Sequence, residues 1–178
     1  MESTEERNRA KVGKLAGIVG IICNFALAGG KFVVGTLVSS MSIVADSVNN
    51  LSDAASSIVT LLGFKLAEKP ADKKHPFGHA RFEYLASLTV AVMIFVIGFE
   101  LAKSSVEKII SPTPVKFSLV TILVLVVSIL VKLWMTLFYK KKGKQIHSTT
   151  LLATSADSRN DVLTTTCVLI AMVVELLT

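Results

Sequence analysis

The sequence predicts an all-α fold, a polytopic membrane helical bundle. Hydrophobic residues make up 52% of the 178 residues, and they gather in long runs instead of amphipathic patterns. The mean hydropathy of +0.64 is typical of an integral membrane protein. Because a transmembrane helix needs about 20 residues, the chain is long enough for about five spans joined by short loops.

The five expected spans follow one another with little sequence between them. A charged tail over residues 1–13 comes first, and it lacks the pattern of a cleavable signal peptide. The transmembrane domain is then expected to cover residues 14–178. Its spans are predicted at 14–37, 41–65, 83–105, 117–139 and 147–176, and the second of them is the least apolar.

Lysine and arginine are distributed unequally between the two sides of the expected bundle. Thirteen lie in or beside the N-terminal tail and the loops after the second and fourth spans, against three (Lys103, Lys108 and Lys116) on the other side. Since cytoplasmic loops carry the excess, we expect a multi-pass protein of the cell membrane with a cytoplasmic N-terminus. Anionic lipid headgroups of the bilayer account for these basic edges, so the net charge of +6 does not indicate a nucleic-acid partner.

The second span, which contains "ADSVNNLSD", has a polar face. Asp46, Asn50 and Asp53 are spaced i, i+4 and i+7, so they share one side of a helix. An ionised Asp at the centre of a bilayer costs at least about 2.5 kcal/mol, so such residues normally face a bundle interior and mark an ion path. Asp53, expected nearer the cytoplasmic end, is a candidate path residue. The alternative is that these groups only form hydrogen bonds with neighbouring helices.

The fifth span supplies a second polar face in "TSADSRNDVLTTT". Asp157 and Asp161 are again spaced i, i+4. If the two faces meet, Asp46, Asn50, Asp157 and Asp161 offer a cation four oxygen-bearing side chains. Three neighbouring carboxylates are unfavourable unless a divalent cation or protons neutralise them. The residue types therefore suit an exchange of metal for protons.

The loop "EKPADKKHPFGHARFEYL" contains Asp72, His75 and His79 between the second and third spans. Its histidines have the spacing of a helical zinc-protease motif, but Pro76 and Gly78 disfavour a regular helix and no Glu follows the first His. Without a general base or nucleophile, we expect no enzyme. The three side chains could hold a metal ion such as Zn(II), or the histidines could be loop residues without a ligand.

Three motifs together resemble the transmembrane part of the cation diffusion facilitators, proton-coupled exporters of divalent metals. "ADSVNNLSDAASS" is similar to their second-helix motif, "KKHPFGHARFEYL" to their histidine-containing loop and "ADSRNDVLTT" to their fifth-helix motif. The resemblance covers the chain from about Lys14 onward. It implies a four-ligand transport site, and a second site in the loop that some members have. The matching residues are Asp46, Asn50, Asp157 and Asp161 for the first, and Asp72, His75 and His79 for the second.

Members of that family have six spans followed by a cytoplasmic metal-binding domain, and they act as homodimers. The five spans expected here end at "MVVELLT". We therefore expect the sixth helix and the cytoplasmic C-terminal domain to be absent from this chain, and a homodimer for the full-length form. The resemblance implies efflux of a divalent cation by proton antiport. The alternative is a truncated membrane interaction protein that transports nothing.

The donor types of the four matched residues favour one cargo over others. The family's zinc exporters typically place a histidine among these ligands, whereas here they are Asp, Asn, Asp and Asp. Carboxylate and amide oxygens are hard donors, which suit Mn(II). We expect Mn(II) as the transported metal, with Fe(II) or Zn(II) as alternatives, and no bound cofactor.

Overall fold

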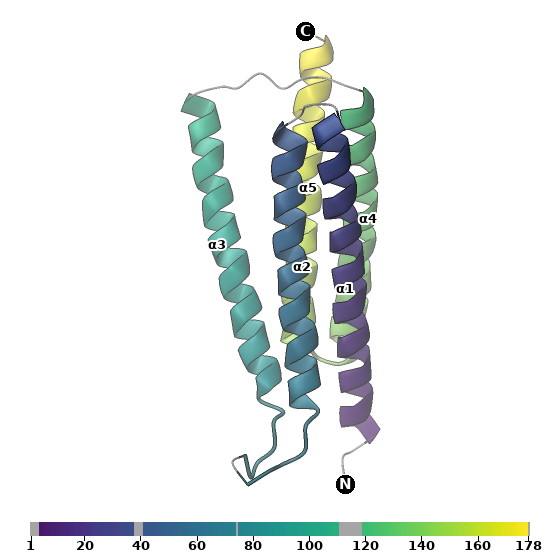
Figure 1. Cartoon of the computed structure of the whole chain (residues 1–178), viewed down its shortest axis with the longest axis vertical. Coiled ribbons are helices and arrows are strands. Elements are labelled where there is room, and N and C mark those ends of the chain that lie inside the picture. Colours follow the sequence, from purple (N-terminus) through teal and green to yellow (C-terminus); the bar gives the residue numbers. More distant parts are fainter. Residues whose placement is uncertain (1–3, 38–40, 74, 111–118, 178) are drawn as a thin grey trace.

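The computed structural model describes residues 4–37, 41–73, 75–110 and 119–177, and the described chain is entirely helical apart from its connections. It forms α1 (Thr4–Leu37), α2 (Met41–Ala67), α3 (Phe82–Ile110), α4 (Leu119–Gln145) and α5 (Thr149–Leu177). The predicted all-α class with five helices is thereby confirmed. α1 packs mainly on α2 and α4 on α5, while α3 stands at the side of the bundle and contacts α2 and α5 (Figure 1).

Three helices are long and apolar enough to cross a membrane by length and composition, as judged over the described residues. They are Asn8–Leu37, Phe82–Glu100 and Leu119–Gln145. α2 and α5 contain the acidic residues of the two polar faces, which lowers their hydropathy. Large apolar side chains on α3 point outward, among them Leu88, Phe95 and Phe99. In a bilayer such an apolar surface faces lipid, whereas polar side chains of α2 such as Asp53 and Ser57 are buried in the bundle.

The helical structure begins earlier than the first expected span. α1 starts at Thr4, so most of the expected tail at 1–13 is helical. Residues 1–3 of that tail lie outside the described residues, and so do the first two residues of the span expected at 117–139. Ion pairs tie this extension to its neighbours. Arg9 Nη2 lies 3.0 Å from Glu83 Oε2 at the start of α3, and Lys14 Nζ lies 2.5 Å from Glu68 Oε2 just after α2.

Small residues allow α1 and α2 to approach closely. A Cβ atom added at Gly17 would lie 2.8 Å from Leu61 Cβ and 3.0 Å from Leu61 Cα, so any larger residue would push the helices apart. Helix pairs in membranes commonly pack through such small residues. Further along, Phe64, Met135 and Leu151 form a buried apolar cluster that joins α2, α4 and α5.

The connections with the most basic residues gather at one end of the bundle. The start of α1, the loop between α2 and α3 and the connection between α4 and α5 lie at this end, and the end of α5 lies at the other (Figure 1). The last connection is short. His147 takes a positive φ of 50°, and the Ser148 N–H donates to the Gly143 carbonyl at 2.9 Å, which closes the end of α4.

Candidate metal sites

One acidic cluster lies inside the bundle, where α2 faces α5. Asp53 of α2 and the pair Asp157 and Asp161 of α5 each offer a carboxylate oxygen, and these three oxygens lie within 4.8 Å of one another. Asp53 is buried, and both α5 residues are half-buried. We call these three residues the acidic cluster. Carboxylate oxygens at this spacing suit a divalent cation of hard character.

One side-chain hydrogen bond to backbone joins two helices beside the acidic cluster, and another lies within α2. The Ser155 hydroxyl, two residues before Asp157, donates to the Thr136 carbonyl of α4 at 2.9 Å and fixes α5 against α4. On α2, the Ser57 hydroxyl donates to the Asp53 carbonyl at 3.0 Å. Asp157 and Asp161 point the same way because they are one helical turn apart.

A lysine that the sequence motifs did not include occupies the acidic cluster. Lys132 of α4 places its Nζ atom 2.6 Å from Asp53 Oδ2 and 2.6 Å from Asp161 Oδ2, and its side chain is 4% exposed. The residue was recognisable as a lone charge in the apolar run "SILVKLWM". Charged residues inside a membrane span rarely face lipid and usually pair with one another, so its position was itself informative.

Asp46, the other predicted carboxylate ligand of α2, is not part of the acidic cluster. Asp46 pairs with Lys31 of α1, whose Nζ is 2.8 Å from Asp46 Oδ2. Asn50 is buried, and its amide donates to the Asp46 carbonyl at 3.0 Å. The structure thus brings Asp157 and Asp161 together with Asp53, not with Asp46. Lys31 was also absent from the motifs, although it too is a single charge in an apolar run.

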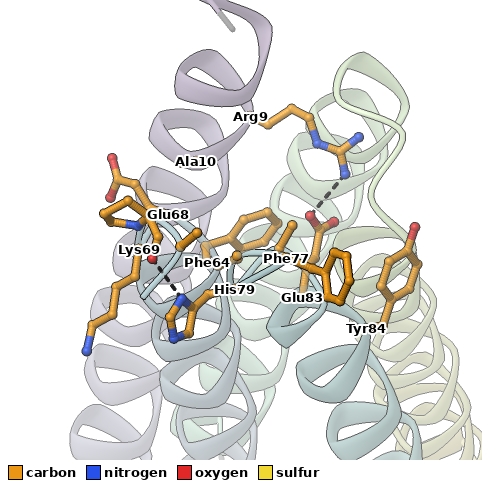
Figure 2. Close-up of a pocket in the computed structure, with 14 residues that line it drawn as sticks. Arg9, Ala10, Phe64, Glu68, Lys69, Phe77, His79, Glu83 and Tyr84 are labelled. Atoms are coloured by element: carbon orange, nitrogen blue, oxygen red, sulfur yellow. Dashed lines mark hydrogen bonds and ion pairs between the residues drawn. The ribbon is translucent and has the colours of Figure 1, made fainter. Parts of the chain in front are cut away.

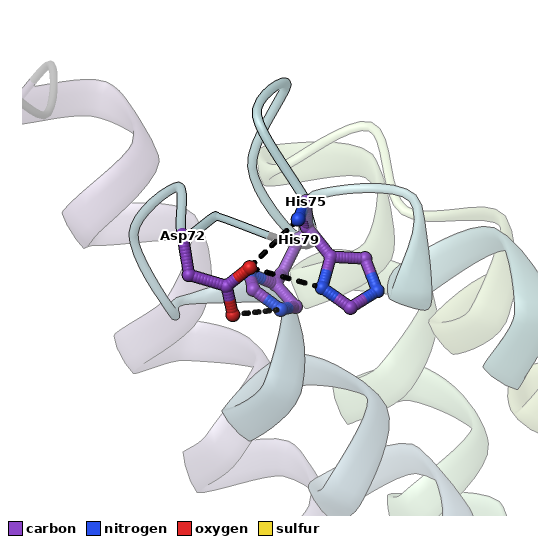
Figure 3. A group of neighbouring side chains, drawn as sticks. All are labelled: Asp72, His75 and His79. Atoms are coloured by element: carbon purple, nitrogen blue, oxygen red, sulfur yellow. Dashed lines mark hydrogen bonds and ion pairs between the residues drawn. The ribbon is translucent and has the colours of Figure 1, made fainter.

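A second cluster lies in the loop between α2 and α3. Asp72, His75 and His79 each present a ligand atom within 4.8 Å of the others (Figure 3). His75 Nδ1 lies 3.2 Å from Asp72 Oδ1, and His79 Nε2 lies 3.6 Å from Asp72 Oδ2. Gly78, at a φ of 78°, provides the turn that returns the chain to His79. The three residues grouped by sequence therefore converge in space.

Backbone contacts fix the orientation of the His79 ring. His79 Nδ1 lies 3.1 Å from the Pro70 carbonyl oxygen. This contact is the dashed line at His79 in Figure 2. A carbonyl can only accept, so Nδ1 carries the hydrogen, and in the neutral ring Nε2 has the lone pair that can bind a metal ion. Metal-binding histidines commonly have this arrangement. The ring also lines a cavity of about 570 Å³ at the end of α2, beside the Arg9–Glu83 pair.

These features define a multi-pass membrane protein of helices with acidic side chains inside its bundle. The family model described as the cation efflux transmembrane domain matches residues 17–178. The chain therefore belongs to the cation efflux family, a family of transporters and not of enzymes. This confirms the resemblance stated from the three motifs.

Several characterised and uncharacterised proteins are similar over most of this chain. An uncharacterized transporter of Methanocaldococcus jannaschii is 34% identical over 158 residues, which are 89% of this chain and 56% of the relative. The manganese efflux system protein MneS of Bacillus subtilis is 29% identical, over 88% of this chain and 54% of its own length. The magnetosome protein MamB of Magnetospira sp. is 32% identical, over 80% of this chain and 49% of its own length. The chain spans about half the length of these curated relatives.

Proposed function

We propose that the chain forms the membrane part of an exporter that exchanges a divalent cation for protons. The observation that carries this proposal is the acidic cluster between α2 and α5. When all are ionised, its three carboxylates and the Lys132 ammonium have a net charge of −2. One divalent cation or two protons would neutralise this charge, so the two cargoes compete for the same buried place.

The cargo path runs along the polar face of α2. Asp157 and Asp161 bind the cargo, and Asp53 is their partner on α2 in the conformation described. We propose that Asp46 and Asn50, the other two residues that the family motif implies, line the cargo path on the same face of α2 and guide the cargo without setting its binding affinity. Asp46 lies seven residues from Asp53, which is about 10 Å along a helix.

Mn(II) is the proposed cargo. All the proposed path residues are Asp or Asn, which bind metals through oxygen. Compared with nitrogen or sulfur ligands, hard oxygen ligands favour Mn(II) over Zn(II). The name of MneS, a manganese efflux protein, adds support from a relative. Fe(II) and Zn(II) remain competitors, because Zn(II) binds most sites at least as tightly. In a transport competition we expect the protein to move Mn(II), and an Asp157→His variant to shift toward Zn(II), since imidazole suits zinc.

The loop cluster is proposed as an accessory metal site on the cytoplasmic side. Its two histidines and one carboxylate suit Zn(II) or a similar ion, and the Pro70 carbonyl orients His79 for that purpose. The gathering of basic connections at one end of the bundle supports a cytoplasmic N-terminus in the cell membrane (Figure 1). We further propose that the full-length form works as a homodimer, as the resemblance implies.

Transport in proteoliposomes tests the proposal. The reconstituted protein should take up Mn(II) with an opposite flow of protons, and Asp157→Asn should abolish both. Asp72→Asn, which changes a carboxylate outside the membrane, is the matched control and should leave exchange largely intact. Unchanged exchange in Asp157→Asn would overturn the proposal. A chain that inserts and associates but binds no metal would instead support a membrane interaction protein.

A further inference from the structure

Lys132 takes the place of a cation inside the acidic cluster. Its Nζ atom is 2.6 Å from Asp53 Oδ2 and also 2.6 Å from Asp161 Oδ2, so the ammonium group bridges α2 and α5. The Lys132 side chain is 4% exposed, and those of Asp53 and Asp161 are 5% and 16% exposed. Water therefore screens these contacts little.

A divalent cargo needs the same oxygen atoms. Hard divalent ions lie about 2.0 to 2.6 Å from their oxygen ligands, which is close to the distance at which Nζ already lies. An ammonium and a metal ion cannot share the space between Asp53 Oδ2 and Asp161 Oδ2, and their positive charges repel. Cargo that enters the cluster must move Nζ aside.

We propose that Lys132 is a tethered counter-cation, which neutralises part of the charge of the acidic cluster and competes with the cargo for Asp53 and Asp161. This inference rests on the proposed transport site and adds a residue that sets its affinity. Competition from Lys132, which is always present, weakens the binding of the cargo. An exporter needs such weakened binding because it must release the cargo. Lys132 thus keeps the carboxylates of the cluster close together when no cargo is bound, and it prevents the cluster from binding the metal too tightly.

A buried hydroxyl, which the described part of the chain leaves without a hydrogen-bond partner, lies on the same face of α4 as Lys132. Ser128 is one helical turn from Lys132 on the same face of α4. Its Oγ atom is buried and has no hydrogen-bond partner within the described residues. An unsatisfied buried hydroxyl is unfavourable, so a hydrogen bond from Nζ to this oxygen would offset part of the cost of moving the ammonium away from the carboxylates.

The second buried lysine supplies a matched control. Lys31 is also 4% exposed and also forms an ion pair, but with Asp46, which is outside the acidic cluster. Replacing Lys31 by Met removes a buried charge of the same kind without freeing an oxygen of the cluster. The two lysines therefore separate competition at the cluster from a general effect of charge in the bundle.

Binding of Mn(II) and Zn(II) can be measured by calorimetry in lipid nanodiscs, with His75 and His79 replaced by Ala so that only the membrane site is titrated. Lys132→Met should bind Mn(II) at least about tenfold more tightly, because one charge-assisted interaction with each carboxylate no longer has to be broken. Lys132→Arg, which keeps the charge, should show no such gain. Lys31→Met should stay within about threefold of the parent.

A folded Lys132→Met that binds equally or more weakly would overturn the inference, because the lysine would then hold the carboxylates in place without competing. A gain of similar size in Lys31→Met would also overturn it. If Lys132→Met does not fold, the unmodified chain with ¹⁵N-labelled lysine gives the answer. The Lys132 Nζ resonance should shift on addition of Zn(II), and an unchanged resonance at saturating Zn(II) would contradict displacement.

The same titrations distinguish failure of this inference from failure of the proposed function. If neither the parent nor Lys132→Met binds Mn(II) or Zn(II), the transport site itself is wrong and the inference falls with it. If the parent binds and Asp157→Asn does not, while Lys132→Met shows no gain, only the role of Lys132 is wrong.

Discussion

Replacing Asp53 by Asn tests which carboxylate of α2 completes the cargo site. The change removes one charge and keeps the size of the side chain, and Lys132 retains Asp161 as a partner at 2.6 Å. Asp46→Asn is the matched variant on the same helix face. Because Asp46 pairs with Lys31 and lies outside the acidic cluster, the structure predicts different results for the two changes.

The expected reduction in affinity follows from the size of the acidic cluster. Its three oxygens lie within 4.8 Å of one another, so an ion among them would be about 3 Å from each. At an effective dielectric constant of about 20, a divalent ion and one carboxylate at that distance attract by roughly 11 kcal/mol. The Asn oxygen and water restore most of this attraction. If about a quarter is not restored, the affinity falls by about 2.7 kcal/mol, or roughly 100-fold.

Mn(II) calorimetry in nanodiscs measures both variants, on a background in which the two loop histidines are replaced by Ala. Asp53→Asn should bind roughly 100-fold more weakly, and Asp46→Asn should change affinity by less than about threefold. Circular dichroism establishes that each variant keeps its helices. The opposite order, with Asp46→Asn losing binding and Asp53→Asn retaining it, would refute the reasoning and favour the four-residue set of the family motif.

Two other predictions concern the loop and the packing of α1. Replacing His75 and His79 by Ala should remove one equivalent of bound Zn(II) and leave the membrane site filled. The control is His147→Ala, at the chain's third histidine, which should not change the amount of bound Zn(II). Loss of all bound metal from the double variant would contradict two separate sites. Gly17→Leu should destabilise the bundle by about 1 to 3 kcal/mol in a denaturation assay, because its side chain would overlap the facing backbone of α2. Gly29→Leu, where an added Cβ atom meets nothing within 4 Å, should cost little, and equal effects of the two would show that α1 and α2 are not closely packed there.

The amino-acid sequence by itself determined the helical class and the polar faces. Long apolar runs predict membrane helices for two reasons. The bilayer core has a fixed thickness, and because it contains no water, each backbone N–H and C=O group must be paired within the helix. The i, i+4 spacing places Asp157 and Asp161 on one face whatever surrounds them. The loop residues Asp72, His75 and His79 are close in the chain, so a short turn suffices to bring them together.

Only the tertiary structure decided which side chains from different helices meet. Periodicity gives the face of a helix, but not the rotation and axial shift of that helix against its neighbours, which depend on packing such as that at Gly17. For that reason Asp53 joins the α5 pair while Asp46 turns to Lys31. The place of Lys132 has the same origin, since its two partners are 79 and 29 residues away in the chain and are brought to it by the packing of α4 against the rest of the bundle.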